Sequence, residues 1–221
     1  MAAPRVVVGI DLAGSPRRAT GGCVLRGLRA VTAVLSDDDE IIDFIRAARP
    51  ALVTIDAPLH LPPGRRSIED RNGAHYRPCD LALRALGIPF FPITLGPMRM
   101  LTVRGMALRK RLVRAGFRVL EMYPGGAQDV WGIPRARRDR AKLRAGLVRL
   151  GLKGLKTEAT ADELDAATGA LVGRLFLQGR ARMLGDERTG AILLPRADLR
   201  TSASKGRTSA GRGSGGPSAG P

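Results

Sequence analysis

The segment VVVGIDLAGS, residues 6–15, decides the fold expected for this chain. Its continuous β-branched run is typical of a strand that is buried on both faces, as in the middle of an α/β sheet. Asp11 ends the run, where a carboxylate is costly unless something there uses its charge. Gly14 follows and lets the backbone approach a ligand closely. The segment therefore predicts a functional carboxylate at a strand end, and the alternative is a turn Asp that accepts hydrogen bonds from local amides.

The rest of the chain predicts an α/β fold in which a mixed sheet is flanked by helices. Strands are expected at residues 5–11, 19–26, 29–35, 51–56, 117–122 and 191–194, and helices at 37–48, 79–86, 99–115, 136–150 and about 160–183. A hairpin followed by a crossover helix and another strand indicates both antiparallel and parallel pairing. Ser36 is the expected cap of the first helix. Thr160 and Glu163 have capping-box spacing and predict the start of the last one.

Composition predicts one domain, residues 1–196, followed by a disordered Ser/Gly/Arg-rich tail, residues 197–221, which has too few apolar residues to fold. No apolar run of about 18 residues occurs, so no membrane-spanning helix is expected. The first residues enter a strand pattern directly, so no signal peptide is expected either. Cys23 and Cys79 lack the spacing of a disulfide framework or a zinc site. A reduced, cytoplasmic setting is the simplest interpretation.

The positive charge of the chain is concentrated in one block. The net charge is +17, and residues 99–156 contribute +13 of it, from 16 Lys and Arg against 3 acidic residues. Such a block is the electrostatic footprint of nucleic-acid binding, although the preference for Arg over Lys also fits a GC-rich genome. The predicted contacts to nucleic acid are Arg77, Arg84, Arg109, Arg137 and Arg138. For Arg84 the alternative is an exposed helix pair with Asp80.

Further carboxylates follow other predicted strands or open a helix. Asp56 ends the strand at 51–56. If that strand neighbours the first, the two strands lie about 4.8 Å apart, and the carboxylates of Asp11 and Asp56 could reach one pair of metal ions. Glu121 could be a metal ligand, orient one, or pair with an Arg of the basic block. Asp162 and Asp165 share a helix face, although acidic residues in a first turn are also expected from the helix dipole. Carboxylates brought together repel one another, and a hard divalent cation is the usual remedy.

Five motifs in this order resemble an uncharacterised, domain-of-unknown-function type of family of predicted RNase H-like nucleases. The motifs are Gly9-Ile10-Asp11-Leu12-Ala13, Ile55-Asp56-Ala57-Pro58, Arg77-Pro78-Cys79-Asp80 with Leu83-Arg84, Glu121-Met122-Tyr123-Pro124, and Asp162 to Ala166. The resemblance covers about residues 5–195 and implies a ribonuclease H-like fold. It also implies two Mg²⁺ or Mn²⁺ ions, with Asp11 bridging them, Asp56 as the fourth-strand ligand, and Asp165 with Asp162 as late-helix ligands.

The function expected from these features is metal-dependent hydrolysis of phosphodiester bonds in nucleic acid, with Asp11, Asp56, Glu121 and Asp165 as catalytic residues. One alternative is an ATP-binding protein of the actin and sugar-kinase type, because residues 9–15 resemble the first phosphate loop of those proteins. Such proteins need two domains of this kind, and this chain is short for that. The other alternative is a nucleic-acid-binding protein with a decayed active site. The choice between DNA and RNA, the mode of cleavage and the oligomeric state stay open.

Overall fold

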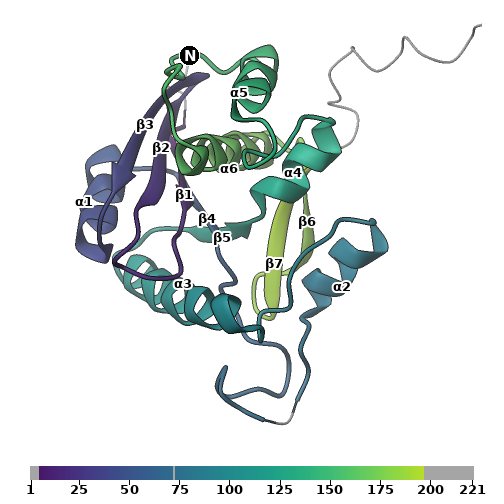
Figure 1. The fold of residues 1–221 in the computed structure, drawn as a ribbon. Coiled ribbons are helices and arrows are strands. Elements are labelled where there is room, and N and C mark those ends of the chain that lie inside the picture. The colour runs from purple at the N-terminus through teal and green to yellow at the C-terminus, as the bar shows by residue number, and fades with distance from the viewer. Residues whose placement is uncertain (1–4, 72, 197–221) are drawn as a thin grey trace, which may run out of the picture.

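The structure is a computed structural model that describes residues 5–71 and 73–196. The predicted tail at 197–221 therefore lies outside the described residues. A seven-stranded mixed sheet lies between two layers of helices (Figure 1), which confirms the predicted α/β fold with a mixed sheet flanked by helices. The strands are β1 (Val7–Asp11), β2 (Thr20–Arg26), β3 (Arg29–Leu35), β4 (Leu52–Asp56), β5 (Val119–Met122), β6 (Ala181–Asp186) and β7 (Gly190–Pro195). The helices are α1 (Asp38–Ala48), α2 (Pro78–Ala85), α3 (Gly96–Arg114), α4 (Pro124–Trp131), α5 (Arg140–Arg149) and α6 (Ala161–Leu177).

The sheet has the strand order β3-β2-β1-β4-β5-β7-β6. The pairs β1-β2, β2-β3 and β6-β7 are antiparallel, whereas β1, β4, β5 and β7 run parallel to one another. Parallel neighbours end at the same edge of a sheet, so the chain leaves β1, β4 and β5 on one side of the molecule. None of the described helices is both long and apolar enough to cross a membrane.

Strand β1 is buried on both faces, as its uninterrupted apolar sequence predicts. Val7 and Val8 are both 0% exposed, and they belong to two different cores. Val7 lies in the core that α4, α5 and α6 cover, and Val8 lies in the core that α1 and α3 cover. Because successive side chains of a strand point to opposite faces, Gly9 and Asp11 share the face of Val7. Asp11 therefore lies on the side of the sheet that faces α6.

Helix α6 packs directly on the backbone of β1 and β2, because two glycines leave room for it. A Cβ atom added at Gly9 would lie 2.1 Å from the carbonyl oxygen of Ala166. A Cβ atom added at Gly21 would lie 2.0 Å from the carbonyl oxygen of Asp162. No side chain fits at these distances without moving the helix. The two glycines thus determine how close the first half of α6 comes to the end of β1.

The start of α6 is held by side-chain hydrogen bonds, as the capping-box spacing predicts. Thr160 accepts a hydrogen bond from the amide of Glu163, and the Glu163 carboxylate accepts one from the amide of Thr160. The other carboxylate oxygen of Glu163 accepts a hydrogen bond from the Thr32 hydroxyl of β3, at 2.7 Å. The helix start is therefore tied to the sheet as well as capped.

Three local predictions were wrong. Helix α4 was not expected, because Pro124 was interpreted as a break, whereas it occupies the first turn, where its missing N–H costs nothing. The last helix ends at Leu177 rather than near 183, since Gly179 turns the chain with φ +72° into β6. Asp37, and not Ser36, caps α1 by accepting two backbone hydrogen bonds.

We expect Gly9→Ala to lower the free energy of unfolding by about 3 kcal/mol, the upper end of the range for overpacked cores. The reason is that the new methyl group meets the backbone of α6, which cannot rotate away as a side chain can. Denaturant unfolding measures the change. Gly96→Ala is the matched control, because a Cβ atom there meets nothing within 4 Å. Equal stability of the two variants would contradict the close packing of α6 on β1.

Candidate active site

Asp11 and Asp56 lie side by side at the ends of two parallel strands. They are register partners in the β1–β4 pair. Thr54 contacts Gly169 and Gly173 of α6, so Asp56, two residues on, faces α6 as Asp11 does. Among the described residues, no backbone amide donates a hydrogen bond to either carboxylate. The alternative interpretation of both residues as hydrogen-bonded turn residues therefore finds no support.

The two carboxyl groups are placed where negative charge is unfavourable. Burial raises the pKa of Asp11 well above its ordinary value, and the charges of Asp56, Asp165 and Asp162 raise it further. Burial likewise raises the pKa of Asp56, with Asp165 and Glu121 adding to the effect. The two carboxyl groups also act on each other directly, so that a proton on one of them is favoured. Without a cation, these groups accordingly share a proton instead of carrying two full charges.

Helix α6 contributes two more carboxylates from the turn that lies over β1 and β2. Asp162 is exposed and lines the cleft, whereas Asp165 is half-buried one turn further along. Burial raises the pKa of Asp165 to about 6, against the effect of a 2.6 Å hydrogen bond from the Gln128 amide. Gln128, on α4, is 1% exposed and also donates to the Thr168 hydroxyl. Gln128 therefore orients Asp165 without neutralising it.

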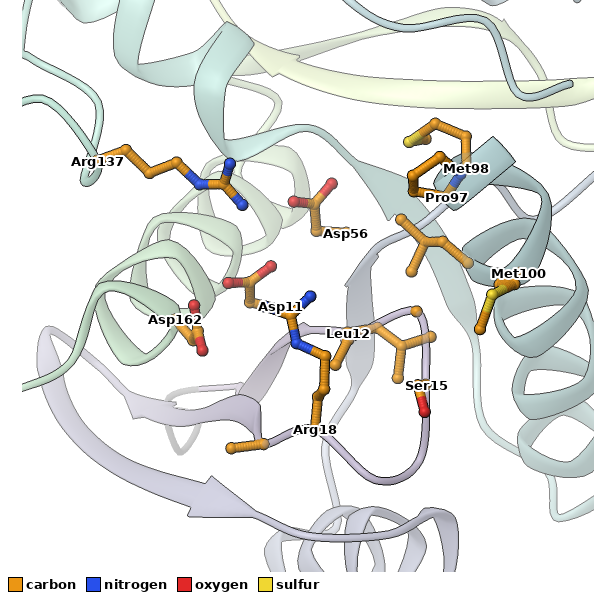
Figure 2. Close-up of a pocket in the computed structure, with 14 residues that line it drawn as sticks. Asp11, Leu12, Ser15, Arg18, Asp56, Pro97, Met98, Met100, Arg137 and Asp162 are labelled. Carbon is orange, nitrogen blue, oxygen red and sulfur yellow. The ribbon is translucent and has the colours of Figure 1, made fainter. Parts of the chain in front are cut away.

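Asp11, Asp56 and Asp162 line a cleft of about 610 Å³, with Asp11 and Asp56 at its floor, whereas Asp165 is not part of its lining. Figure 2 shows Asp11, Asp56 and Asp162 directed into it, with Arg137 and Arg18 reaching in from two sides. The remaining walls come from the β1–β2 loop, residues 12–19, and from the first turns of α3. The cleft thus combines an acidic floor with two guanidinium groups.

The β1–β2 loop is anchored on both sides. The Thr20 hydroxyl accepts a hydrogen bond from the amide of Ala13. Arg104 of α3, which is nearly buried, donates to the carbonyl groups of Ala13 and Ser15 at 2.6 and 3.1 Å. Arg104 also pairs with Asp38 at the start of α1. The loop next to Asp11 is therefore held by interactions with two helices.

The donor set at the floor of the cleft fits a hard divalent cation. All of its groups are carboxylates, and within residues 5–71 and 73–196 none of Asp11, Asp56, Asp162 and Asp165 forms an ion pair with Lys or Arg. Residues 5–71 and 73–196 contain no group of three or more Asp, Glu, His or Cys side chains that are arranged to hold one ion. Mg²⁺ needs no such cage, because it usually takes one or two carboxylates together with water and substrate phosphate oxygens.

Glu121 does not point into this cleft. It follows Val119 by two residues and so faces the opposite side of the sheet from Asp11 and Asp56. Its carboxylate accepts two hydrogen bonds from the guanidinium of Arg77, at 2.6 and 2.7 Å, and one from the amide of Leu59. Leu59 lies three residues after Asp56, so Glu121 holds the chain that leaves the site. The prediction of Glu121 as a catalytic residue finds no support in this geometry, which gives it a positioning role.

Arg77 was predicted to contact nucleic acid, near a phosphate, and this geometry gives that prediction no support. Its side chain is 1% exposed and is bound by both Glu121 and Asp80. Burial opposes its charge, but the two carboxylates raise its pKa well above the ordinary value, so it stays charged. Asp80 is therefore engaged by Arg77, and it does not form the predicted alternative pair with Arg84.

The other four predicted Arg residues lie in four different places. Arg137 lines the cleft, and Arg138 lies on a separate hollow beside Asp139. Arg109 lies near His60, whose pKa is lowered to about 4 by burial first and by Arg109 second. Arg84 is exposed and stacks on the ring of Tyr76 at 4.2 Å.

Two residues of the site were missed from the sequence. Arg18 lines the cleft, and its place in the loop that Asp11 opens could have revealed it. Gln128 could not be found without recognising α4, the helix on which it lies.

The fold and the cleft define an α/β protein with a seven-stranded mixed sheet and a carboxylate site at its strand ends. Residues 9–189 match the family model described as a protein of unknown function, DUF429. The chain therefore belongs to the DUF429 family, in agreement with the predicted membership of an uncharacterised family.

Two solved structures are similar to this chain. One is T. thermophilus RuvC in complex with a Holliday junction substrate, with 17% identity, a TM-score of 0.43, and coverage of 79% of this chain and 96% of that chain. The other is a Thermus thermophilus RuvC structure, with 15% identity, a TM-score of 0.42 and the same coverage. Similarity at this level says nothing about the activity of this chain. No curated protein matches the sequence.

We expect Arg77→Met to lower the free energy of unfolding by about 3–5 kcal/mol, the usual effect of removing one partner from a buried ion pair. The substitution leaves Glu121 and Asp80 buried without their cation. Thermal and denaturant unfolding measure the loss. Arg111→Met is the control, because it removes an exposed pair with Asp39 and should change stability little. A comparable loss in both variants would contradict the structural role of the Arg77 cluster.

Proposed function

We propose that this protein is a metal-dependent phosphodiesterase acting on nucleic acid. The observation that carries the proposal is the adjacent pair Asp11 and Asp56, at the floor of an open cleft and without a protein cation. Buried carboxylates of this kind cluster at functional sites, because their instability is relieved when a ligand binds. One or two Mg²⁺ or Mn²⁺ ions would supply a centre that activates water and neutralises the leaving oxygen.

Each acidic residue has a distinct place in this proposal. Asp11 would be the central metal ligand, because its carboxyl group is close enough to Asp56, Asp165 and Asp162 to feel the charge of all three. Asp56 adds a ligand from β4, and Gln128 holds Asp165 in a fixed orientation. Asp162, exposed at the rim, completes the acidic set from α6.

Arg18 and Arg137 bind the nucleic-acid backbone in this proposal. Both line the cleft, and neither is among the Arg residues that form ion pairs within the described residues. A guanidinium group can donate two hydrogen bonds to one phosphate, which orients it as well as attracting it. The net charge of +13 on residues 99–156 raises the concentration of a polyanion near the molecule. The type of nucleic acid is not implied by these contacts.

We expect Asp11→Asn to abolish Mn²⁺-dependent cleavage of a labelled nucleic acid while the protein stays folded. Without metal, the variant should melt at the same temperature or higher, because carboxylate repulsion is reduced. Wild-type protein should gain about 2.7 kcal/mol at a Mn²⁺ concentration 100 times Kd, and the variant should lose this gain. Asp43→Asn, at an exposed position of α1, is the control and should keep both the cleavage activity and the Mn²⁺-induced gain in stability. A lower melting temperature with a retained Mn²⁺ response would exclude a metal site at Asp11.

We expect nucleic-acid binding to weaken with salt, and Arg18→Gln or Arg137→Gln to reduce that dependence. For duplex DNA, each lost phosphate contact should make the slope of log K against log salt shallower by about 0.9. Arg26→Gln is the control, because β2 pairs with β1 so that Arg26 lies at the end of the sheet away from Asp11. Titrations at several salt concentrations measure the slopes, and an equal effect at Arg26 would argue for general charge attraction without a specific cleft.

A further inference from the structure

A second, smaller cavity adjoins the carboxylate cleft. Its volume is about 140 Å³, and it shares Asp56, Met98 and Leu101 with the cleft. Asp56 therefore lies between the two cavities. If a phosphate of a nucleic-acid strand lies at Asp11 and Asp56, the next group along that strand lies beside the opening of the second cavity.

The walls of this cavity suit one flat ring. Phe90, Phe91 and Ile93, from the chain between α2 and α3, form one side, and Met98 and Leu101 of α3 form another. Its volume is close to that of a cavity of about 150 Å³ that holds one benzene molecule. A single heterocycle fits such a space, whereas a helix or a strand does not.

One end of the cavity is polar. Arg77, Asp80 and Glu121 line it, and they are locked to one another by hydrogen bonds of 2.6 to 3.1 Å. The three side chains are almost fully buried and bond to one another, so they make this end of the cavity polar and rigid beside its apolar walls. A nucleobase has the matching features, since its faces are aromatic and its edge carries both donors and acceptors.

The mouth of the cavity carries aromatic surface that the fold leaves uncovered. Phe91 is 70% exposed, the largest exposed fraction among the large apolar side chains of the described residues. Next to it, Phe90 packs edge to face on Tyr76, and Arg84 stacks over that Tyr76 ring. Aromatic and Arg side chains arranged beside a basic surface are how single-stranded nucleic acid is bound.

We propose that the cavity takes up one unstacked nucleobase, next to the phosphate that lies at Asp11 and Asp56, with Phe91 stacking on it or on its neighbour. This inference rests on the proposed function. It names the substrate class of that site as a strand with an unpaired base, because a base in an intact duplex must first leave its stack to enter a pocket. The carboxylate cleft then handles the backbone, and the second cavity selects for unpaired structure.

The test compares the affinities of a short single strand and of the same sequence as a duplex, in Ca²⁺ to limit cleavage. Phe91→Ala should weaken single-strand binding about 5- to 100-fold, the usual effect of losing a base-stacking side chain, and leave duplex binding unchanged. Leu95→Ala is the matched control, because Leu95 is 48% exposed on the same connection and does not line this cavity. That variant should bind as wild type, and melting curves should show that both variants are folded.

A scan with abasic nucleotides sharpens the result. An abasic position removes one base and keeps its phosphate, so one position should weaken wild-type binding strongly and should have no further effect in Phe91→Ala. Wild-type binding that tolerates an abasic site at every position overturns the inference, as does a Phe91→Ala variant that loses single-strand and duplex affinity equally or loses neither. In these cases nucleic-acid binding itself survives. Failure to bind either substrate instead overturns the proposed function, and the inference falls with it.

Discussion

The contact between α6 and the backbone of β1 and β2 is the constraint on which the site depends. Gly9 and Gly21 allow the carbonyl groups of Ala166 and Asp162 to come within van der Waals distance of the strands. The same contact brings the acidic first turns of α6 over the end of β1. A helix held further away by ordinary side chains would pack against the sheet equally well as a core element, but it would not bring a third and a fourth carboxylate to Asp11 and Asp56.

Two groups of buried carboxylates occur close together, and they are stabilised in different ways. Glu121 and Asp80 are neutralised by Arg77, which costs the desolvation of three charges but leaves no group unpaired. Asp11 and Asp56 have no such partner, and their raised pKa values record the unfavourable free energy of their charged forms. The difference follows from the faces of the sheet, since β4 turns Asp56 towards α6 and β5 turns Glu121 away from it. Glu121 and Asp80, bound to Arg77, therefore stabilise the fold, whereas Asp11 and Asp56 remain available to bind a cation.

Strand β1 and its pairing partner could be predicted from the sequence because their signals are local. A continuous β-branched run that ends in Asp identifies β1, a second such run identifies β4, and parallel neighbours necessarily bring their ends together. The face on which Glu121 lies depends on the first residue of β5, and a shift by one residue reverses it. The burial of Arg77 depends on Glu121, which is distant in the chain, as well as on the nearby Asp80. Helix α4 depends on Gly126 packing closely on Leu194 and Ile88, a tertiary contact that overrides the low helix propensity of glycine.

The opposite charges of the basic block and of the cleft floor have a joint consequence for how the site works. Arg18 and Arg137 attract a phosphate to the rim, but the carboxylates below repel it over the few ångströms that remain, a distance too short for salt to screen. A proton shared by Asp11 and Asp56 removes only part of that repulsion. A divalent cation reverses the sign of the potential at the floor and leaves the Arg residues at the rim unaffected. In the proposed function, metal binding and phosphate binding are therefore a single coupled equilibrium, and the basic block alone holds nucleic acid near the cleft without placing a phosphate in it.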